Sequence, residues 1–152
     1  DDVSGIDSTL ELLDFPKHLE NLNLKDLMKE AYKDLRYSIH SNAGYRTSPF
    51  SKEEDILFNL DDYIEMEKPY KILYKDSLDS NKMDVFVRGI KIELNNFDCI
   101  KVFIDEINKG EPIKVRDLLA TLDEEWDDEI GLYILSEINK NHGLVSVKQL
   151  AE

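Results

Sequence analysis

Apolar and polar residues follow two different patterns along this chain, and the patterns come in a definite order. Between residues 23 and 40, apolar side chains recur every three or four positions, which predicts an amphipathic helix. Residues 51–68 have similar spacing, and Ser51 and Glu54 stand at the distance of a capping box. We therefore expect two helices in the first part of the chain.

Alternation replaces helical spacing in the next part of the chain, as expected for β-strands. The alternating runs cover residues 70–75, 83–88 and 90–94. Arg88 and Gly89 separate the last two runs, and a glycine there favours the tight turn of a hairpin. The three runs should form an antiparallel meander with the third strand at an edge of the sheet, where backbone groups lack partners.

Three further helical patterns follow the strands, beginning near Asn96, Lys114 and Asp127. Asn95 or Asn96 can cap the first of them, and Gly110 lies at its expected end. Residues 144–147 have the composition of a short terminal strand. We predict an α+β fold with two parts. Residues 1–68 form a helical segment for docking or dimerisation, and residues 69–152 form a winged-helix module, a three-stranded antiparallel sheet followed by three helices.

Charge narrows the set of partners. The 152 residues include 33 acidic and 19 basic side chains, a formal net charge of -14. Nucleic-acid binders need clustered Lys and Arg for the phosphates, so we expect no nucleic-acid partner and favour a peptide or protein, with a basic one suiting the charge. The chain has no apolar run long enough to cross a membrane, so we expect no membrane partner. It contains a single cysteine and so cannot form an internal disulfide, which indicates a cytoplasmic protein.

Motifs that carry chemistry are missing from the sequence. The three histidines fall in separate regions without the spacing of a metal site, and the six glycines are too scattered for a phosphate loop. The acidic run at residues 123–129 lacks the glycine and alternating ligands of an EF-hand. Cys99 has no neighbouring histidine and fits the apolar face of a helix. We assign no catalytic residue, metal or cofactor, and we do not expect an enzyme.

The order of elements from Tyr70 to Val147 resembles a small winged-helix family. This family is the peptide-recognition element of the clusters that make ribosomally synthesised, post-translationally modified peptides, typified by the chaperone of pyrroloquinoline quinone biosynthesis. The residues that carry the resemblance are the hairpin from Val85 to Leu94, the helix ending at Asn108, Lys109 and Gly110, the short helix with Val115, Leu118, Leu119 and Leu122, and the last helix before Gly143, Leu144 and Val145.

In that family a leader peptide is held as an added strand on the third strand, against the third helix. The resemblance implies peptide-binding residues on both elements here. They are Ile90, Lys91, Ile92, Glu93 and Leu94 on the strand, and Asp127, Asp128, Tyr133 and Glu137 on the helix. It also implies a partner protein that presents a precursor peptide to a modifying enzyme.

Two other interpretations stay open. The same pattern is similar to the C-terminal winged helix of cupin-type (JmjC-like) ribosomal oxygenases, whose preceding helices mediate dimerisation; the iron-binding motif of those enzymes is absent, so this chain would be a non-catalytic portion. The net charge instead suits an acidic immunity protein, antitoxin or nucleic-acid mimic that blocks a basic partner.

Overall fold

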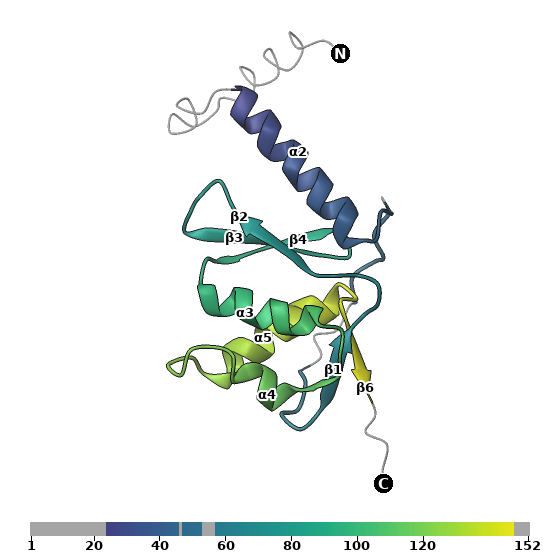
Figure 1. Ribbon diagram of the computed structural model, residues 1–152, viewed down its shortest axis with the longest axis vertical. Helices are drawn as coiled ribbons and strands as arrows, with labels where there is room; N and C mark the ends of the chain where they lie inside the picture. Colours follow the sequence, from purple (N-terminus) through teal and green to yellow (C-terminus); the bar gives the residue numbers. More distant parts are fainter. Residues whose placement is uncertain (1–23, 46, 53–56, 148–152) are drawn as a thin grey trace. The chain divides into compact units, whose positions relative to one another are not determined.

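The computed structural model describes residues 24–45, 47–52 and 57–147 (Figure 1). Within these residues the protein has a mixed α+β fold with four helices and two small antiparallel sheets of three strands each. The chain divides into two compact units, residues 1–34 and 35–152. The elements in chain order are α2 (Leu24–Ser41), β1 (Tyr63–Met66), β2 (Leu73–Asp76), β3 (Lys82–Val87), β4 (Ile90–Asn95), α3 (Asp98–Asn108), β5 (Ile113–Lys114), α4 (Val115–Leu119), α5 (Asp128–Lys140) and β6 (Leu144–Val147).

The first predicted helix is confirmed as α2, which spans 18 residues. The described part of the first unit consists of the beginning of this helix, and the second unit starts at Leu35. The helix ends at Ser41, and Ala43 and Gly44 then adopt left-handed conformations with φ of 53° and 88°. The amide of Gly44 donates to the carbonyl of Ile39 at 2.9 Å, which satisfies one of the last helical carbonyls.

The predicted meander is also confirmed, in the order β2-β3-β4. Strand β3 lies in the middle, and five of its six residues are buried. Arg88 and Gly89 form the two-residue turn between β3 and β4, with φ of 49° and 88°. Positive φ at both central positions is the signature of a type I′ turn, whose twist matches that of the flanking strands.

The predicted helix over residues 51–68 is wrong in its described part. Residues 53–56 lie outside the described structure, but Tyr63–Met66 is the strand β1. This strand is the middle of the second sheet, in the order β5-β1-β6, and both pairings are antiparallel. The boundary expected at residues 68 and 69 therefore falls between β1 and β2, inside the second unit.

Tertiary pairing explains why β1 is a strand despite its helical spacing. The buried side chains of Ile64 and Met66 alternate with the half-buried ones of Tyr63 and Glu65, so one face of β1 packs in the core. The strands β5 and β6, which flank β1, pair with its backbone on both sides. A run of four residues is too short for periodicity to separate a strand from a helix. The chain reverses just before β1, where the amide of Asp62 donates to the carbonyl of Asn59 at 3.0 Å.

Asp61 holds the beginning of β1 near the chain that follows β5. Its carboxylate lies 3.2 Å from Nη2 of Arg116 and 3.6 Å from Nζ of Lys114. The hydrogen bond and charge of Arg116, followed by the charge of Lys114, lower the pKa of Asp61. These ion pairs are exposed to solvent and therefore add little stability. The two segments are joined mainly by backbone bonds, in which the amides of Val115 and Arg116 donate to the carbonyls of Asp62 and Leu60, each at 2.9 Å.

The three helices after the meander are confirmed as α3, α4 and α5, although the cap predicted for α3 is wrong. Phe97 is its N-cap residue and forms no side-chain capping bond. The side-chain amide of Asn96 instead donates to the carboxylate of Asp76 and the carbonyl of Ser80, each at 3.1 Å, so it ties the loop between β2 and β3. Gly110 ends the α3 region as predicted, with φ of 75°.

One hydrophobic core joins both sheets and all three of these helices. Figure 1 shows α3 and α5 on one side of the meander. The core contains residues of β1, β3, α3, α4, α5 and β6 in contact with one another. Core residues that are less than 2% exposed to solvent include Ile64, Met83, Val85, Phe103, Leu118 and Leu135.

The strand assignment of β1 predicts the effect of two substitutions. Ile64 is fully buried, so Ile64→Ala should lower the free energy of unfolding by about 2–5 kcal/mol, because it leaves a cavity. Leu57 is 68% exposed, so Leu57→Ala should change it by less than about 0.5 kcal/mol. Urea denaturation of both variants checks this. Equal losses would contradict the packing described here, because a helix with both residues on its apolar face would bury them alike.

Candidate functional site

Strand β4 is an edge of the meander, and its register shows which backbone groups point outward. In a two-residue hairpin the pair that flanks the turn, Val87 and Ile90, is hydrogen-bonded, and bonded pairs then alternate with non-bonded ones. The amide of Asn96, which donates to the carbonyl of Asn81 at 2.9 Å, fits this alternation. Glu93 is a non-bonded position, so its N–H and C=O point away from β3 toward the open edge.

The side chains of β4 divide between the two faces of the sheet. Ile92 and Leu94 are half-buried and pack against the core, opposite Val85 and Met83 of β3. Ile90, on the same face at the turn, is 36% exposed. The other face carries the exposed side chains of Lys91 and Glu93. The strand thus has one apolar face directed to the core and one charged face.

Helix α5 runs antiparallel to β4, because contacts at both of its ends reach the β3–β4 hairpin. At its C-terminal end, a Cβ atom on Gly143 would lie 2.6 Å from Cγ1 of Val87, so this turn packs directly on the end of β3. Before its N-terminal end, the ring of Trp126 contacts Phe97 edge to face, with centroids 5.0 Å apart. Phe97 follows the end of β4, so both helix ends are fixed to the hairpin.

The two elements also match in length. The 13 residues of α5 and the six of β4 each extend roughly 20 Å. Contacts just beyond both ends of α5 therefore join the helix that carries Asp128, Tyr133 and Glu137 to the hairpin whose second strand is Ile90–Asn95. The bounds of α5 leave Asp127 as its N-cap residue rather than in the helix.

The solvent face of α5 is acidic and aromatic. Tyr133 is 58% exposed and Ile130 is 44% exposed. Asp127 and Asp128 are exposed at the start of the helix, and Glu137 is half-buried further along it. The whole acidic run from residue 123 to 129 that surrounds half-buried Trp126 is exposed. This face offers apolar contact area within a negative field, which suits a positively charged partner.

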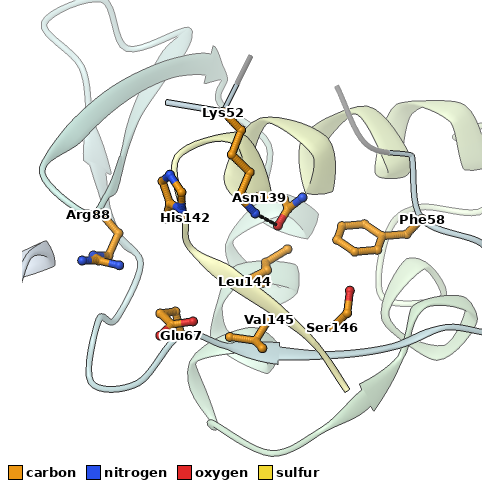
Figure 2. Close-up of a pocket in the computed structure, with 9 residues that line it drawn as sticks. All are labelled: Lys52, Phe58, Glu67, Arg88, Asn139, His142, Leu144, Val145 and Ser146. Carbon is orange, nitrogen blue, oxygen red and sulfur yellow. Dashed lines mark hydrogen bonds between the residues drawn. The ribbon is translucent and has the colours of Figure 1, made fainter. Parts of the chain in front are cut away.

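A pocket of about 380 Å³ lies beside β6 and the C-terminal end of α5 (Figure 2). Two hydrogen bonds lie at this pocket: Nζ of Lys52 donates to Oδ1 of Asn139 at 2.9 Å, and Nε2 of His142 lies 2.7 Å from the carbonyl of Phe50. These bonds hold residues 50–52 against the end of α5. Arg88 also lines this pocket, and the sequence pattern singled it out only as a turn residue.

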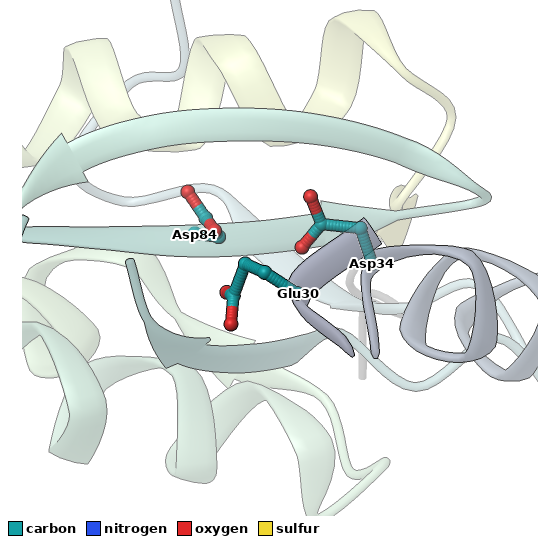
Figure 3. Close-up of side chains that lie close together, drawn as sticks. All are labelled: Glu30, Asp34 and Asp84. Carbon is teal, nitrogen blue, oxygen red and sulfur yellow. The ribbon is translucent and has the colours of Figure 1, made fainter. Parts of the chain in front are cut away.

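A buried ion pair links the first two strands of the meander. Lys75 of β2 and Asp84 of β3 are direct cross-strand partners, and Nζ lies 3.1 Å from Oδ2. Figure 3 shows the Asp84 side chain projecting from β3. The side chains are only 8% and 4% exposed. Removing one partner from such a pair leaves a buried charge, so the pair strongly constrains which residues these two positions accept.

Cys99 lies in the first turn of α3 and is buried. Burial raises the pKa of its thiol, and the negative charge of Asp123 raises that pKa further. The thiol therefore stays protonated at neutral pH, and a protonated thiol is a poor nucleophile. This environment is typical of a cysteine that fills space in a core.

No protein-family model matches the sequence, and neither the curated proteins nor the solved structures contain a match to it. Within the described residues, no helix combines the length and the apolarity that crossing a membrane requires.

The environment of Cys99 predicts slow thiol chemistry. A disulfide reagent such as Ellman's should react with native protein at least about tenfold more slowly than with protein in urea, because the reactive thiolate is scarce and covered. The absorbance of released thionitrobenzoate measures both rates, and a Cys99→Ser variant supplies the blank because the chain has one cysteine. Rapid stoichiometric reaction of the native protein would contradict the burial described here.

Proposed function

We propose that this protein is a non-catalytic module that captures an extended peptide as an added strand on β4, and that it presents a precursor's leader peptide to a modifying enzyme. The observation that carries the proposal is the edge of β4. The Glu93 backbone points outward there, and α5 runs antiparallel to the strand and is joined to the hairpin at both ends. Main-chain bonds on such an edge provide affinity, and neighbouring side chains provide selectivity.

The arrangement of the helices supports a winged-helix interpretation of the second half. Strand β5 lies between α3 and α4, and β6 follows α5, so the order is helix, strand, helix, helix, strand, as in a winged helix. The third strand of the sheet that contains β5 and β6 is β1. It precedes the meander in the sequence, whereas the last strand of a winged helix follows the last helix. In this interpretation the meander is an addition to the helical part, and it supplies the free edge on which the peptide pairs.

The charge of α5 supports a peptide over a nucleic acid. In helix-turn-helix proteins the last helix of the motif enters the major groove, and basic side chains around it contact phosphates. Here the N-cap residue Asp127 and the first two residues of the helix, Asp128 and Glu129, are acidic and exposed. Their repulsion of phosphates would oppose binding, whereas Lys or Arg in a peptide would gain from them.

The strand-addition proposal predicts a position-specific effect of proline. Random peptides long enough to span β4 are displayed and selected on the full chain, and the selected peptides are measured by calorimetry. Glu93→Pro removes an outward N–H and adds a ring on the open edge, so it should weaken binding by at least about tenfold while the protein stays folded. Glu93→Gln keeps the N–H and is the matched control.

A second proline separates edge pairing from hairpin integrity. Ile92 donates across to β3, so Ile92→Pro should destabilise the hairpin itself, with a clear loss in melting temperature that Glu93→Pro does not show. A selection that yields no binding peptides, or peptides that bind the Glu93→Pro variant as tightly as the parent, would overturn the proposal. A salt-sensitive complex with a basic folded protein would favour the inhibitor interpretation instead.

The acidic start of α5 predicts the composition of the selected peptides. They should be enriched in Lys and Arg, and their dissociation constants should rise with salt because exposed charges are screened. The double variant Asp127→Asn, Asp128→Asn should reduce both the affinity and its dependence on salt. Binding that is indifferent to salt and to this double variant would show that α5 does not contribute charge to recognition.

A further inference from the structure

Arg88 occupies a backbone position that disfavours it. Its φ of 49° lies in the left-handed region, in the first central position of the type I′ turn. Asn, Asp and Gly are the residues that this position accepts most easily, because a longer L side chain adds steric cost there. Strain of this kind at a single residue points to a role for its side chain.

The side chain of Arg88 is held in place by two groups from different parts of the chain. Its guanidinium stacks over the ring of Tyr70, with Cζ 3.5 Å from the centroid. Its Nε donates to Oδ1 of Asn42 at 3.2 Å. Stacking together with the Nε bond fixes the plane of the guanidinium and sets the direction of its two terminal nitrogens.

Asn42 is itself fixed, so it is a positioning residue for Arg88. The residue is only 1% exposed to solvent. Its side-chain Nδ2 donates to the carbonyls of Tyr45 and Thr47 at 3.2 and 3.0 Å. With the amide nitrogen committed in this way, the amide oxygen must face Arg88. The turn is anchored as well, because the amide of Gly89 donates to Oγ of Ser41 at 2.9 Å and its carbonyl accepts from Ser38.

The fixed guanidinium borders a hollow of about 330 Å³. Among the described residues, Nη1 and Nη2 of Arg88 have no hydrogen-bond partner. The other described residues that line the hollow include two tyrosines and a threonine, and none of them is acidic. The lining residues are Asn42, Tyr45, Thr47, Tyr70 and Arg88. Within the described part of the chain, which has a net charge of -14 overall, the lining of this hollow thus supplies a cation and no acid.

We propose that this hollow is an oxyanion-binding site in which the Nη1 and Nη2 atoms of Arg88 hold a carboxylate or a phosphate in a bidentate contact. The planar fork of arginine matches two oxygens of either group, and a guanidinium already held by Asn42 and Tyr70 loses little freedom on binding. The strained turn is then the cost of presenting the fork in this orientation.

The oxyanion site is distinct from the peptide-binding edge. Tyr70 precedes β2, and β2 is the edge of the meander opposite to β4. Arg88 lies in the turn before β4, so a ligand in the hollow lies at the turn end of the hairpin, whereas an added strand would pair at the outward backbone of Glu93. The inference does not depend on the proposed function, and either can fail while the other holds.

The probes for the test are inorganic phosphate and acetate, each titrated into the full ¹⁵N-labelled chain and followed by NMR. The expected result is saturable shift changes at the Arg88 Nε and at the backbone amides of Asn42 and Tyr70. The probe that saturates at the lower concentration identifies the preferred oxyanion. Arg88→Lys keeps the charge without the fork and should bind about tenfold more weakly.

Two more variants make the test specific. Arg88→Asn places a favoured residue in the turn but removes the contacts with Asn42 and Tyr70, so it should abolish the titration while the protein stays folded. Arg116→Gln makes the same change in net charge at a distant surface and should leave the titration unchanged. The proposal is overturned if neither probe saturates, if Arg88→Lys binds as tightly as the parent, or if Arg116→Gln loses binding equally.

Discussion

The packing of α5 beneath the β3–β4 hairpin is the constraint on which the candidate site depends. It requires a residue without a side chain at position 143, because a Cβ there would lie 2.6 Å from Val87 and 2.7 Å from the branched side chain of Ile138. Val87 and Ile138 are β-branched and stiff, so neither moves cheaply. The close approach at Gly143 and the ring contact at Trp126 set the helix direction, and the direction determines that the acidic helix start faces the far end of β4.

The second sheet strengthens this arrangement by joining segments that are distant in sequence. β1 pairs with β5 and with β6, which lie about fifty and eighty residues later in the chain. The amide of Glu67 also donates to the carbonyl of Gly143 at 3.0 Å, so the chain beyond β1 contacts the turn that packs on Val87. Long-range pairings of this type cost loop-closure entropy but constrain the helices between the strands once they form.

The elements that were predicted correctly are those whose own periodicity determines them. The alternation of β3 and β4 and the apolar stripes of α2, α3 and α5 are each long enough to decide between strand and helix. β1 was missed because its four residues are compatible with either structure and its partners lie far away in sequence. The cap of α3 was missed for a related reason, since Asn96 bonds to a loop that only the folded meander brings near.

The two candidate sites differ in the same way in how much of each could be predicted. The edge of β4 follows from strand order and register, which the alternating runs and the turn at Arg88 and Gly89 already contain. The hollow beside Arg88 is assembled by Asn42 and Tyr70, from an α-helix end and a loop, so no local pattern reports it. Its only local sign is an arginine where a type I′ turn prefers asparagine.

Since the turn that carries Arg88 also begins β4, any ligand that reshaped this turn would alter the first pair of the hairpin, Val87 with Ile90. A ligand that binds the existing geometry would leave the register of β4 unchanged. The preformed bonds of Asn42 and Gly89 favour the second case, so the two sites should bind their ligands independently.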